Sequence, residues 1–388
     1  MPHRHTAEAN GTAFGVPGNG RPRQRRRMSL NRLADLSLVT VLAVLVLMVF
    51  LPVPYLVQTP GPTVDVLGEI DGEPAMSVTA TDDAAAEDHP PQAGSLELLT
   101  VGVSGGPGRE LGAVPVLTSW ISSQNTVVPT EMYYPVGTTR DTVSAENAAQ
   151  MSSSQEVAVA AALTGLDIPF ERRTVITGVE AGMPADGALR EGDRVLAVDG
   201  QHPAQAGDVV AAVQAWDGEA PLRFEVDRAG DSEEVEVTPQ TGEAGPRIGA
   251  LLADDFDFPV QVDFHVGDIG GPSAGLIFSL AVIDHLTPGD LTGGAHLAGT
   301  GEITVDGQVG AIGGARQKAF AAHARGAEYF LSPAGNCQEV IQAVDEGSLD
   351  GMRVIRVDTL DDAVSALEDI AASDAGEPAG LPECQGTP

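Results

Sequence analysis

One serine and one lysine draw attention, because each lies in a short glycine-rich motif that suits nucleophilic catalysis. Ser273 lies in GGPSAG (residues 270–275), and Lys318 lies in GGARQK (residues 313–318). A serine hydroxyl needs a base to take its proton before it can attack a carbonyl carbon. The two motifs therefore predict a Ser–Lys dyad, in which Ser273 is the nucleophile and Lys318 is the general base.

The identity of the second residue supports this prediction. Lysine and arginine together number 21 in the 388-residue chain, and Lys318 is the only lysine. Arginine cannot lose its proton in a protein, whereas a buried lysine can shift towards the neutral form. A position that must act as a base therefore tolerates lysine and excludes arginine. The alternative is a surface lysine of an amphipathic helix that has no catalytic role.

The residues after Ser273 predict the element that positions it. From Ala274 to His285 the apolar residues recur at helical spacing. Pro272 suits the first turn of such a helix, where its missing N–H costs nothing. Ser273 would then lie at a helix N-terminus, where free amides and the helix dipole stabilise the negative charge of an oxyanion.

Three ordered motifs resemble the Lon-type serine peptidases. GPSAG at 271–275 resembles their nucleophile motif, TGEIT at 300–304 looks like their central motif, and GGARQK at 313–318 is similar to their G-G-x-K-E-K. The resemblance covers Pro259 to Asp369. It implies that Ser273 and Lys318 form the dyad and that Thr300 helps to orient the lysine. It also implies a supporting role for the neighbours of the serine, which are Gly271, Pro272 and Ala274.

Two positions depart from the pattern of this family. Arg316 replaces its first motif lysine, and Ile269-Gly270 replace the acidic residue before the serine motif. Neither departure removes the dyad. The resemblance further implies a homo-oligomeric ring, such as a hexamer. A Walker A loop, which binds ATP in the full Lon enzymes, needs Gly-Lys-Ser/Thr, but Lys318 is followed by alanine.

A second interpretation of Ser273 comes from the G-x-S-x-G spacing of residues 271–275. That pattern also fits the nucleophile elbow of α/β-hydrolases, which would make the protein an esterase. The histidines available downstream are His285, His296 and His323, of which the first and last lie on expected helices. A structural histidine is the commoner case, so this interpretation is the weaker one.

Residues 173–239 resemble a PDZ domain. Gly-Met-Pro-Ala at 182–185 and the run LREGDRVLAVDG at 189–200 follow its signature, with a helix expected around 208–216 and strands on either side. PDZ domains bind extended peptides by strand addition. The carboxylate-binding loop of the family has no clear counterpart, and only residues 165–168 offer a candidate. A spacer that shields the active site is the alternative role.

The N-terminal region carries a basic arm and an apolar run. Residues 1–33 contain seven arginines and one acidic residue, which predicts a disordered arm, and Met28 is an alternative start. Residues 36–57 carry no charge and are long enough to span a bilayer of about 30 Å. The arginines place the N-terminus in the cytoplasm. No small-x-small cleavage site follows the run, so we expect an uncleaved anchor in the plasma membrane and an extracytoplasmic catalytic domain.

The composition limits which partners and cofactors we expect. A net charge of −34 argues against nucleic-acid binding. No metal-binding motif is present, so we expect no metal and no cofactor. Cys337 and Cys384 are the only cysteines, and an even count in an exported chain predicts that they form a disulfide.

These observations predict an α/β (α+β) Lon-type peptidase domain preceded by a PDZ-like β-rich domain and one transmembrane helix. The expected segments are a basic arm (1–33), a membrane helix (34–57), a β-containing segment with a linker helix (58–165), the PDZ-like domain (166–242), the peptidase domain (243–372) and an acidic, flexible tail (373–388). The expected function is ATP-independent cleavage of unfolded or loosely structured extracytoplasmic proteins. A PDZ scaffold without peptidase activity is the alternative from another functional class.

Overall fold

The computed structural model describes residues 37–44, 46–47, 52–80, 89, 93–242, 245–267, 269–345, 348–373, 378 and 380–385. The chain divides into two units, Met1–Leu51 and Pro52–Pro388. In the first unit, residues 37–44 and 46–47 are helical. Within the described ranges, no helix has the length and apolar composition needed to cross a bilayer. The basic arm (1–33) lies outside these ranges.

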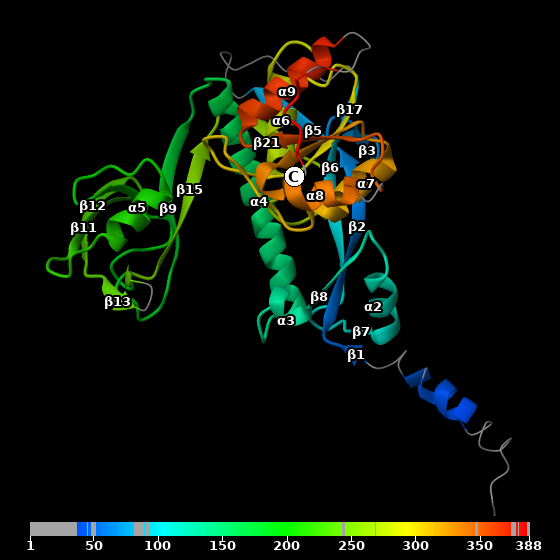
Figure 1. Cartoon of the computed structure of the whole chain (residues 1–388). Coiled ribbons are helices and arrows are strands. Elements are labelled where there is room, and N and C mark those ends of the chain that lie inside the picture. Colours follow the sequence, from blue (N-terminus) through cyan, green and yellow to red (C-terminus); the bar gives the residue numbers. More distant parts are fainter. Residues whose placement is uncertain are drawn as a thin grey trace, which may run out of the picture. The chain divides into compact units, whose positions relative to one another are not determined.

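A six-stranded sheet forms the centre of the second unit (Figure 1). Its strand order is β21-β20-β17-β6-β2-β8. Neighbouring strands are parallel from β21 to β6, and β2 is antiparallel to both β6 and β8. The strands are β2 (Tyr55–Asp65), β6 (Ser95–Ser104), β8 (Thr126–Pro129), β17 (His296–Gly299), β20 (Tyr329–Pro333) and β21 (Arg353–Val357).

Alternating apolar side chains on these strands bury both faces of the sheet. On one face, Leu98 and Leu331 join a core with three helices: α4 (Arg140–Gly165), α6 (Gly275–Leu286) and α9 (Leu360–Ala372). On the other face, Leu99 and Phe330 join a second core with α7 (Ala315–Arg325) and α8 (Cys337–Asp345). Since successive residues of a strand point to opposite faces, adjacent residues separate into the two cores. The result is a sheet between two helical layers.

Shorter elements complete this domain. Most of them are two-stranded pairs or single turns outside the central sheet. They are β1 (Pro52–Val53) with β7 (Leu111–Gly112), β3 (Glu69–Ile70) with β4 (Glu73–Pro74), β5 (Met76–Ala80) with β16 (Val260–Phe264), β18 (Glu302–Ile303) with β19 (Val309–Gly310), helices α2 (Ala113–Trp120) and α3 (Thr130–Tyr133), and the 3₁₀ turn η1 (Ala334–Asn336).

The segment between α4 and β16 has a sheet and a core of its own. The sheet has the order β12-β11-β10-β9-β15, so β15 is an edge strand. Phe224, Val209 and Ile176 belong to its core. The elements are β9 (Glu171–Val179), β10 (Arg194–Val198), α5 (Ala206–Gln214), β11 (Leu222–Arg228), β12 (Asp231–Val237), β13 (Gln240–Gly242), β14 (Gly245–Arg247) and β15 (Ala250–Asp257).

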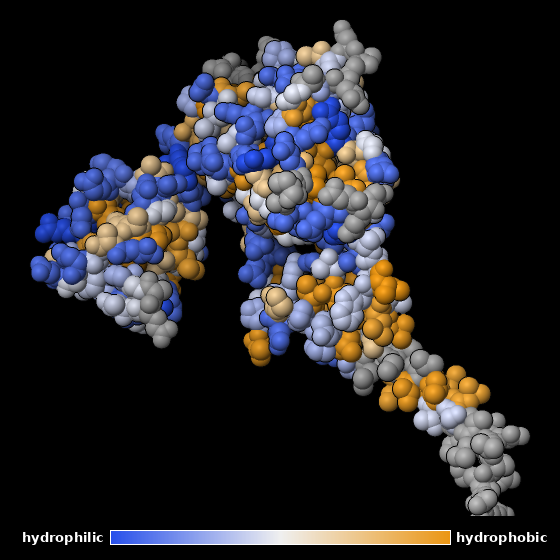
Figure 2. All heavy atoms as spheres, viewed as in Figure 1, coloured by the Kyte–Doolittle hydropathy of each residue, from blue (hydrophilic) through white to orange (hydrophobic). Residues whose placement is uncertain are grey.

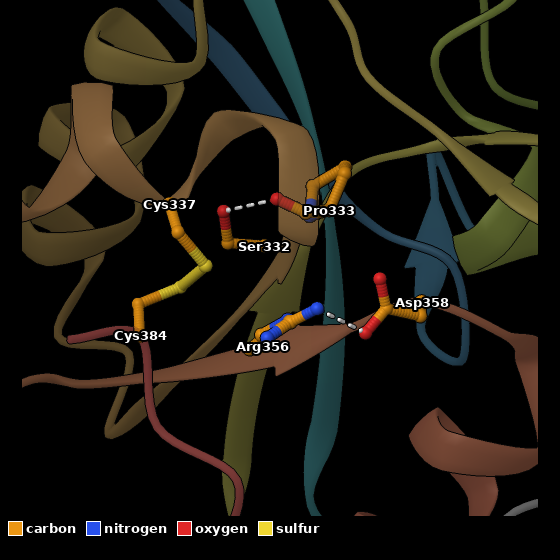
Figure 3. The surroundings of a disulfide bond; sticks show 6 residues. All are labelled: Ser332, Pro333, Cys337, Arg356, Asp358 and Cys384. Atoms are coloured by element: carbon orange, nitrogen blue, oxygen red, sulfur yellow. Dashed lines mark hydrogen bonds and ion pairs between the residues drawn. A yellow bond between two sulfur atoms is a disulfide. The ribbon is translucent and has the colours of Figure 1, made fainter.

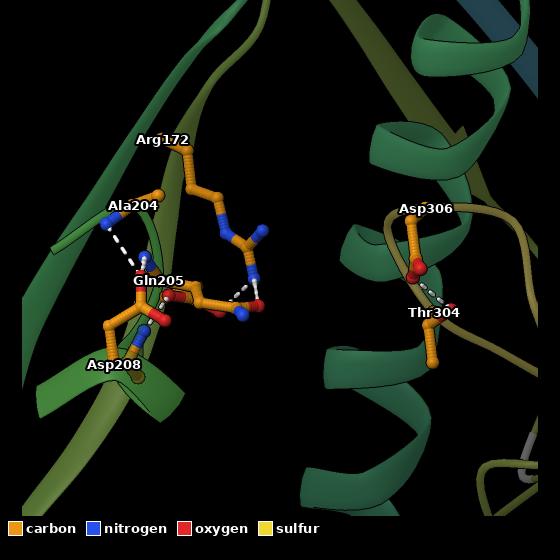
Figure 4. A network of polar contacts seen from close by, with 8 residues as sticks. Arg172, Ala204, Gln205, Asp208, Thr304 and Asp306 are labelled. Atoms are coloured by element: carbon orange, nitrogen blue, oxygen red, sulfur yellow. Dashed lines mark hydrogen bonds and ion pairs between the residues drawn. The ribbon is translucent and has the colours of Figure 1, made fainter. Parts of the chain in front are cut away.

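Polar contacts fix helix α5 onto this sheet (Figure 4). Asp208 Oδ2 accepts hydrogen bonds from the N–H groups of Ala204 and Gln205, at 2.8 and 3.2 Å. Arg172, on β9, donates to Gln205 Oε1 at 3.2 Å and to Asp254 on β15 at 2.6 Å. The start of the helix is therefore held by both strands of the β9–β15 pair.

The sheets revise two of the expected boundaries. Strands β2, β6 and β8 lie in the same sheet as β17, so residues 52–165 contribute to the peptidase fold rather than standing apart from it. The smaller sheet extends to Asp257, because β15 pairs with β9 along its whole length. The expected limit at residue 242 therefore omits its edge strand. The smaller domain is an insertion within the larger one.

The last part of the expected membrane helix forms strands instead. Residues 52–53 and 55–57, which we expected to continue the helix, are strands that pair with β7, β6 and β8. Pro52 and Pro54 explain the difference, because proline lacks the N–H that a helix interior needs. The prediction that the apolar residues continue as a helix is therefore wrong after Leu51.

The C-terminal tail is also more ordered than expected. Leu381 and Cys384 are buried, and residues 382–384 run along the outer edge of β21. The amide of Cys384 donates to Val354 O at 2.9 Å. A disulfide joins Cys384 to Cys337, with the two Cα atoms 5.2 Å apart (Figure 3). The tail therefore covers an edge strand that would otherwise expose its backbone.

Candidate active site

Three side chains from three segments converge beside the central sheet. Lys318 Nζ lies 2.6 Å from Ser273 Oγ and 2.8 Å from Thr300 Oγ1. Thr300 Oγ1 in turn donates to the carbonyl oxygen of Ser273 at 2.9 Å. The two predicted catalytic residues and the predicted orienting threonine are thus in direct contact.

The backbone around Ser273 is a turn that leads into α6. The helix begins at Gly275 with Ala274 as its N-cap, so Pro272 precedes the helix instead of occupying its first turn. Gly271 has φ of 99°, a conformation that favours glycine. The turn places Ser273 beside the N-terminus of α6, where the dipole and the amides can stabilise an oxyanion.

Helix α4 holds this turn from the other side. Asn147 O accepts a hydrogen bond from the Gly271 amide at 3.2 Å, and Ser154 Oγ donates to Pro272 O at 3.0 Å. A Cβ atom on Gly270 would come within 2.7 Å of Asn147 Cβ, so only glycine permits this approach. The glycines before the serine therefore serve the contact with α4 as well as the turn.

The environment of Lys318 favours a neutral amine. Its side chain is on α7 and is 2% exposed. Burial lowers the pKa of Lys318 to about 7, and the nearby carboxylate of Glu302 opposes this shift only in part. With this pKa about half of the Lys318 amines are neutral at pH 7, and the neutral amine can accept the proton of a serine hydroxyl.

The hydrogen bonds of Thr300 set the direction of proton transfer. Its hydroxyl proton is used on Ser273 O, so its oxygen must accept from Lys318 Nζ. A neutral amine that donates to Thr300 keeps its lone pair for another partner. Ser273 Oγ is that partner at 2.6 Å, so Lys318 can act as an acceptor there.

A second set of contacts, which the sequence did not reveal, fixes the start of α7. Asn336 Oδ1 accepts from the Ile312 amide and Asn336 Nδ2 donates to Ile312 O, both at 2.9 Å. Glu339 Oε1 accepts from the amide of Arg316 at 3.1 Å. The position of Asn336 directly before α8 predicts a helix cap, but its side chain instead clamps the turn that leads to Lys318.

A cleft of about 800 Å³ opens at the dyad. Its lining includes Ser273, Lys318, Glu302 and the aromatic pair Tyr133 and Tyr134, and it includes no histidine. The three histidines that could serve as the base of an esterase lie elsewhere. His285 is within α6, His296 is beside Glu97, and His323 is against Asp350 O. The geometry therefore favours a lysine base over a histidine base.

The inserted domain offers a free strand edge in place of the expected carboxylate-binding loop. Residues 165–168, the candidate carboxylate loop, end helix α4, and Ile168 packs on the main core. Strand β15 instead has a free edge among the described strands, and it lies beside α5. Leu251 on β15 and Val210 on α5 are 64% and 43% exposed. These features are suited to strand addition by a peptide.

No group of three or more histidine, cysteine, aspartate or glutamate side chains in the described part of the chain is arranged to hold a metal ion. Ser273, Thr300 and Lys318 together supply a nucleophile, a base and a group that orients the base, as acyl transfer needs.

Comparison with known proteins identifies both domains. Residues 256–368 match the model of the Lon protease (S16) C-terminal proteolytic domain, and residues 175–228 match that of the PDZ domain. The Lon protease of Clostridioides difficile is 37% identical over 94 residues, which are 24% of this chain and 12% of that protein. The peroxisomal Lon protease homolog 2 of Caenorhabditis briggsae is 30% identical over 126 residues, 32% of this chain and 16% of that protein.

Among solved structures, the PDZ domain of an SdrC-like protein from Listeria innocua is similar, with 21% identity and a TM-score of 0.20. The match covers 21% of this chain and 92% of that one. The expectation of a mixed α/β chain with a PDZ domain and a Lon-type peptidase domain is confirmed, and that domain is of the serine peptidase class. The chain spans about an eighth of the length of the first curated relatives.

Proposed function

We propose that the protein is a serine endopeptidase that cleaves unfolded or loosely structured proteins outside the cytoplasm, without ATP, with Ser273 as nucleophile and Lys318 as base. The observation that carries this proposal is the 2.6 Å contact between Ser273 Oγ and the buried Lys318 Nζ. The matches to Lon proteases support the peptidase class, since they cover the motifs of both residues.

The contacts support the following sequence of steps. Neutral Lys318 takes the proton of Ser273 as Oγ attacks the carbonyl carbon of the substrate, and the amides before α6 stabilise the oxyanion. The Lys318 ammonium then gives its proton to the leaving amine, which breaks the peptide bond and leaves an acyl-enzyme. A water molecule, deprotonated by Lys318, hydrolyses that ester and returns Ser273 to its free form.

The dyad is tested by two substitutions. We expect Ser273→Ala and Lys318→Arg to lower hydrolysis of a reduced, alkylated protein by at least a thousandfold, because arginine keeps the charge but cannot serve as a base. Circular dichroism and melting should show that the fold persists. Arg325→Lys is the matched control on the same helix, where the side chain is 59% exposed.

Substantial activity in Lys318→Arg would contradict the mechanism. Failure of the unaltered protein to cleave any peptide or unfolded protein would favour the alternative, a PDZ scaffold that has lost peptidase activity.

ATP independence rests on the lysine content. The sequence has one lysine, which is committed to the dyad, so it holds no Gly-Lys-Ser/Thr phosphate loop. The purified protein should cleave an unfolded substrate at the same rate with and without ATP and Mg²⁺. A dependence on ATP would refute this part of the proposal.

The proposed location is the outer face of the plasma membrane, with the N-terminus in the cytoplasm. The arginine-rich arm and the apolar run that begins at Leu36 support it, and so does the disulfide, which is typical of oxidising compartments. As a helix, the charge-free residues 36–51 would rise about 24 Å, and a bilayer core of about 30 Å accommodates such a segment by thinning locally.

An exposed apolar surface on the second unit supports contact with the membrane. Figure 2 shows hydrophobic side chains gathered over α2, which carries no charged residue. Trp120 and Ile121 at the end of α2 are 74% and 87% exposed. Strand β7, which leads into α2, pairs with β1, where the chain leaves the apolar run. Tryptophan is enriched at membrane interfaces.

The location is tested with a reporter fused after Pro388. A reporter that folds only outside the cytoplasm should be active, and one that works only in the cytoplasm should be silent. The opposite pattern would refute the topology.

We further propose a homo-oligomeric ring, by resemblance to the Lon-type peptidases. Light scattering of the purified protein tests this proposal, because it measures the mass of the assembly. A monomeric mass would exclude the ring.

A further inference from the structure

Three cavities follow one another along helix α4, starting at the catalytic cleft. The cleft of about 800 Å³ and the next cavity, of about 550 Å³, share four lining residues: Asn147, Met151, Ile269 and Gly270. That second cavity shares Ser152 and Gln155 with a third of about 390 Å³, which ends at β16. Because neighbouring cavities have lining residues in common, the three lie side by side along α4, and we call this row of cavities the α4 groove.

One face of α4 forms the floor of this groove. The lining residues of the helix in the second and third cavities recur at intervals of three and four, which places them on a single side. From Asn147 to Val159 the axial rise is about 18 Å. An extended chain advances about 3.3 Å per residue, so the groove has room for five or six residues beyond those at the dyad.

The character of the lining changes along the groove. The second cavity, next to the catalytic cleft, has no charged side chain among its described lining residues, and its Ser144, Asn147 and Gln155 can form hydrogen bonds with the backbone of any peptide. At the far end the lining is apolar, with side chains of Phe258, Val260, Val262 and Phe264. Its charged members are Glu146, Glu156 and Glu302, while Lys318 is the only cationic side chain in the lining.

The same helix also controls the nucleophile. Asn147 O and Ser154 Oγ hold the turn at Gly271 and Pro272, on the helix whose other residues line the groove. A chain lying in the groove would therefore contact the element that positions Ser273. This continuity with the catalytic cleft identifies the occupant as the substrate itself.

We propose that the α4 groove binds an extended segment of the substrate, five or six residues to one side of the scissile bond, and prefers a hydrophobic side chain at its far end. The proposal rests on the proposed peptidase function. Such a site recognises backbone and one apolar residue, which is what an unfolded protein presents and a folded one hides. It would disfavour acidic residues, because the glutamates of the lining repel them.

The experiment measures how much a longer peptide gains over a short one. A fluorogenic peptide that covers only the cleft is extended by six residues, either at its N-terminal or at its C-terminal end. For one of the two extensions we expect kcat/KM to rise at least tenfold. Replacing a phenylalanine five or six residues from the scissile bond by aspartate should remove most of that gain.

Helix α4 provides a matched pair of variants. Ser152→Trp places a large side chain in the groove, whereas Ser153→Trp places one on the adjacent, exposed position outside it. We expect the gain from the longer peptide to vanish in Ser152→Trp and to persist in Ser153→Trp. The ratio of long to short peptide is compared within each variant, so general losses of activity cancel.

Binding gives an independent measurement. Fluorescence polarisation of the two peptides on the Ser273→Ala protein should show tighter binding of the long one, again lost with Ser152→Trp. Equal values for both lengths, or equal effects of both tryptophans, would overturn the groove. Absence of any hydrolysis by the unaltered protein, with this binding difference intact, would overturn the peptidase function alone.

Discussion

The neutral form of Lys318 links catalysis to pH. Burial lowers the pKa of its amine to about 7, so the fraction of free base falls below that pH. Because Ser273 can pass its proton only to the free base, kcat/KM for an uncharged peptide should rise about tenfold per pH unit below pH 7 and level off above it. A pH profile of initial rates measures this.

A profile that is flat from pH 5 to 9 would contradict the assignment of Lys318 as the base. Melting at each pH is the control, since it separates loss of activity from loss of fold.

The same residue destabilises the fold at low pH. Its pKa is about 7 when folded, against an ordinary value of 10.5, so the unfolded chain binds more protons between these values. The cost of burying Lys318 is therefore absent above pH 10.5, grows as pH falls and is complete below pH 7. We expect Lys318→Met to be more favourable to stability at pH 6 than at pH 10, by a few kcal/mol.

Urea unfolding of both proteins at the two pH values measures this difference. A stability difference that does not vary with pH would show that Lys318 is not protonated differently in the folded and unfolded chains.

At the scale of elements, the disulfide fastens the tail to α8. It closes a loop with a sequence separation of 47, for which chain entropy gives about 4 kcal/mol of stabilisation. We expect Cys384→Ser to lower the unfolding free energy by roughly 2–4 kcal/mol. Reductant should destabilise the unaltered protein by a similar amount and leave Cys384→Ser unchanged. A melting temperature insensitive to reductant would show that the bond does not form.

Much of the secondary structure could be predicted, because local patterns determine it. The alanine-rich run from Ala145 to Leu163 predicts a helix, which is α4, and Thr359 with Asp362 fits a capping-box pattern, which forms at α9. The apolar spacing at 353–357 and 222–227 predicts strands, which match β21 and β11 within a residue. In each case the apolar spacing or the cap lies within the element itself.

The elements that were missed depend on distant partners. β2 continues an apolar run, and the strands that pair with it, β6 and β8, lie far along the sequence. Likewise, the amide of Asn336 fits a helix cap as well as a clamp, and the choice depends on Ile312, 24 positions earlier. The dyad could be predicted because its residue types identify it, whereas these supporting contacts have no distinctive residue type.

At the scale of the whole molecule, the PDZ domain can be removed without leaving a broken sheet. Arg173 and Asp255 are cross-strand partners on β9 and β15, so an Asn-Gly turn can replace residues 174–254 and close a hairpin. We expect the shortened protein to cleave a small peptide within about threefold of the normal rate and an unfolded protein at least tenfold more slowly.

The control for this deletion keeps the domain. Leu251→Glu places a charge beside the free edge of β15, where a peptide would add, and should impair cleavage of the protein substrate alone. Equal loss of both activities in the deletion would show that the PDZ domain has a structural role instead.

The insertion of one domain within the other also sets the order in which the protein can mature. Strand β6 can pair with β17 only after β17 has been synthesised. Thr292 Oγ1 likewise donates a hydrogen bond to Ala93 O, which lies 199 positions earlier in the chain. The PDZ domain is contiguous, so it can fold while the ribosome is still making the rest, whereas contacts so distant in sequence form slowly. Ser273 and Lys318 can meet only after α7 has been synthesised and has packed on β2 and β6. The nascent chain would therefore carry a folded binding module well before it carries a protease, and proteins beside it would be safe from cleavage during synthesis.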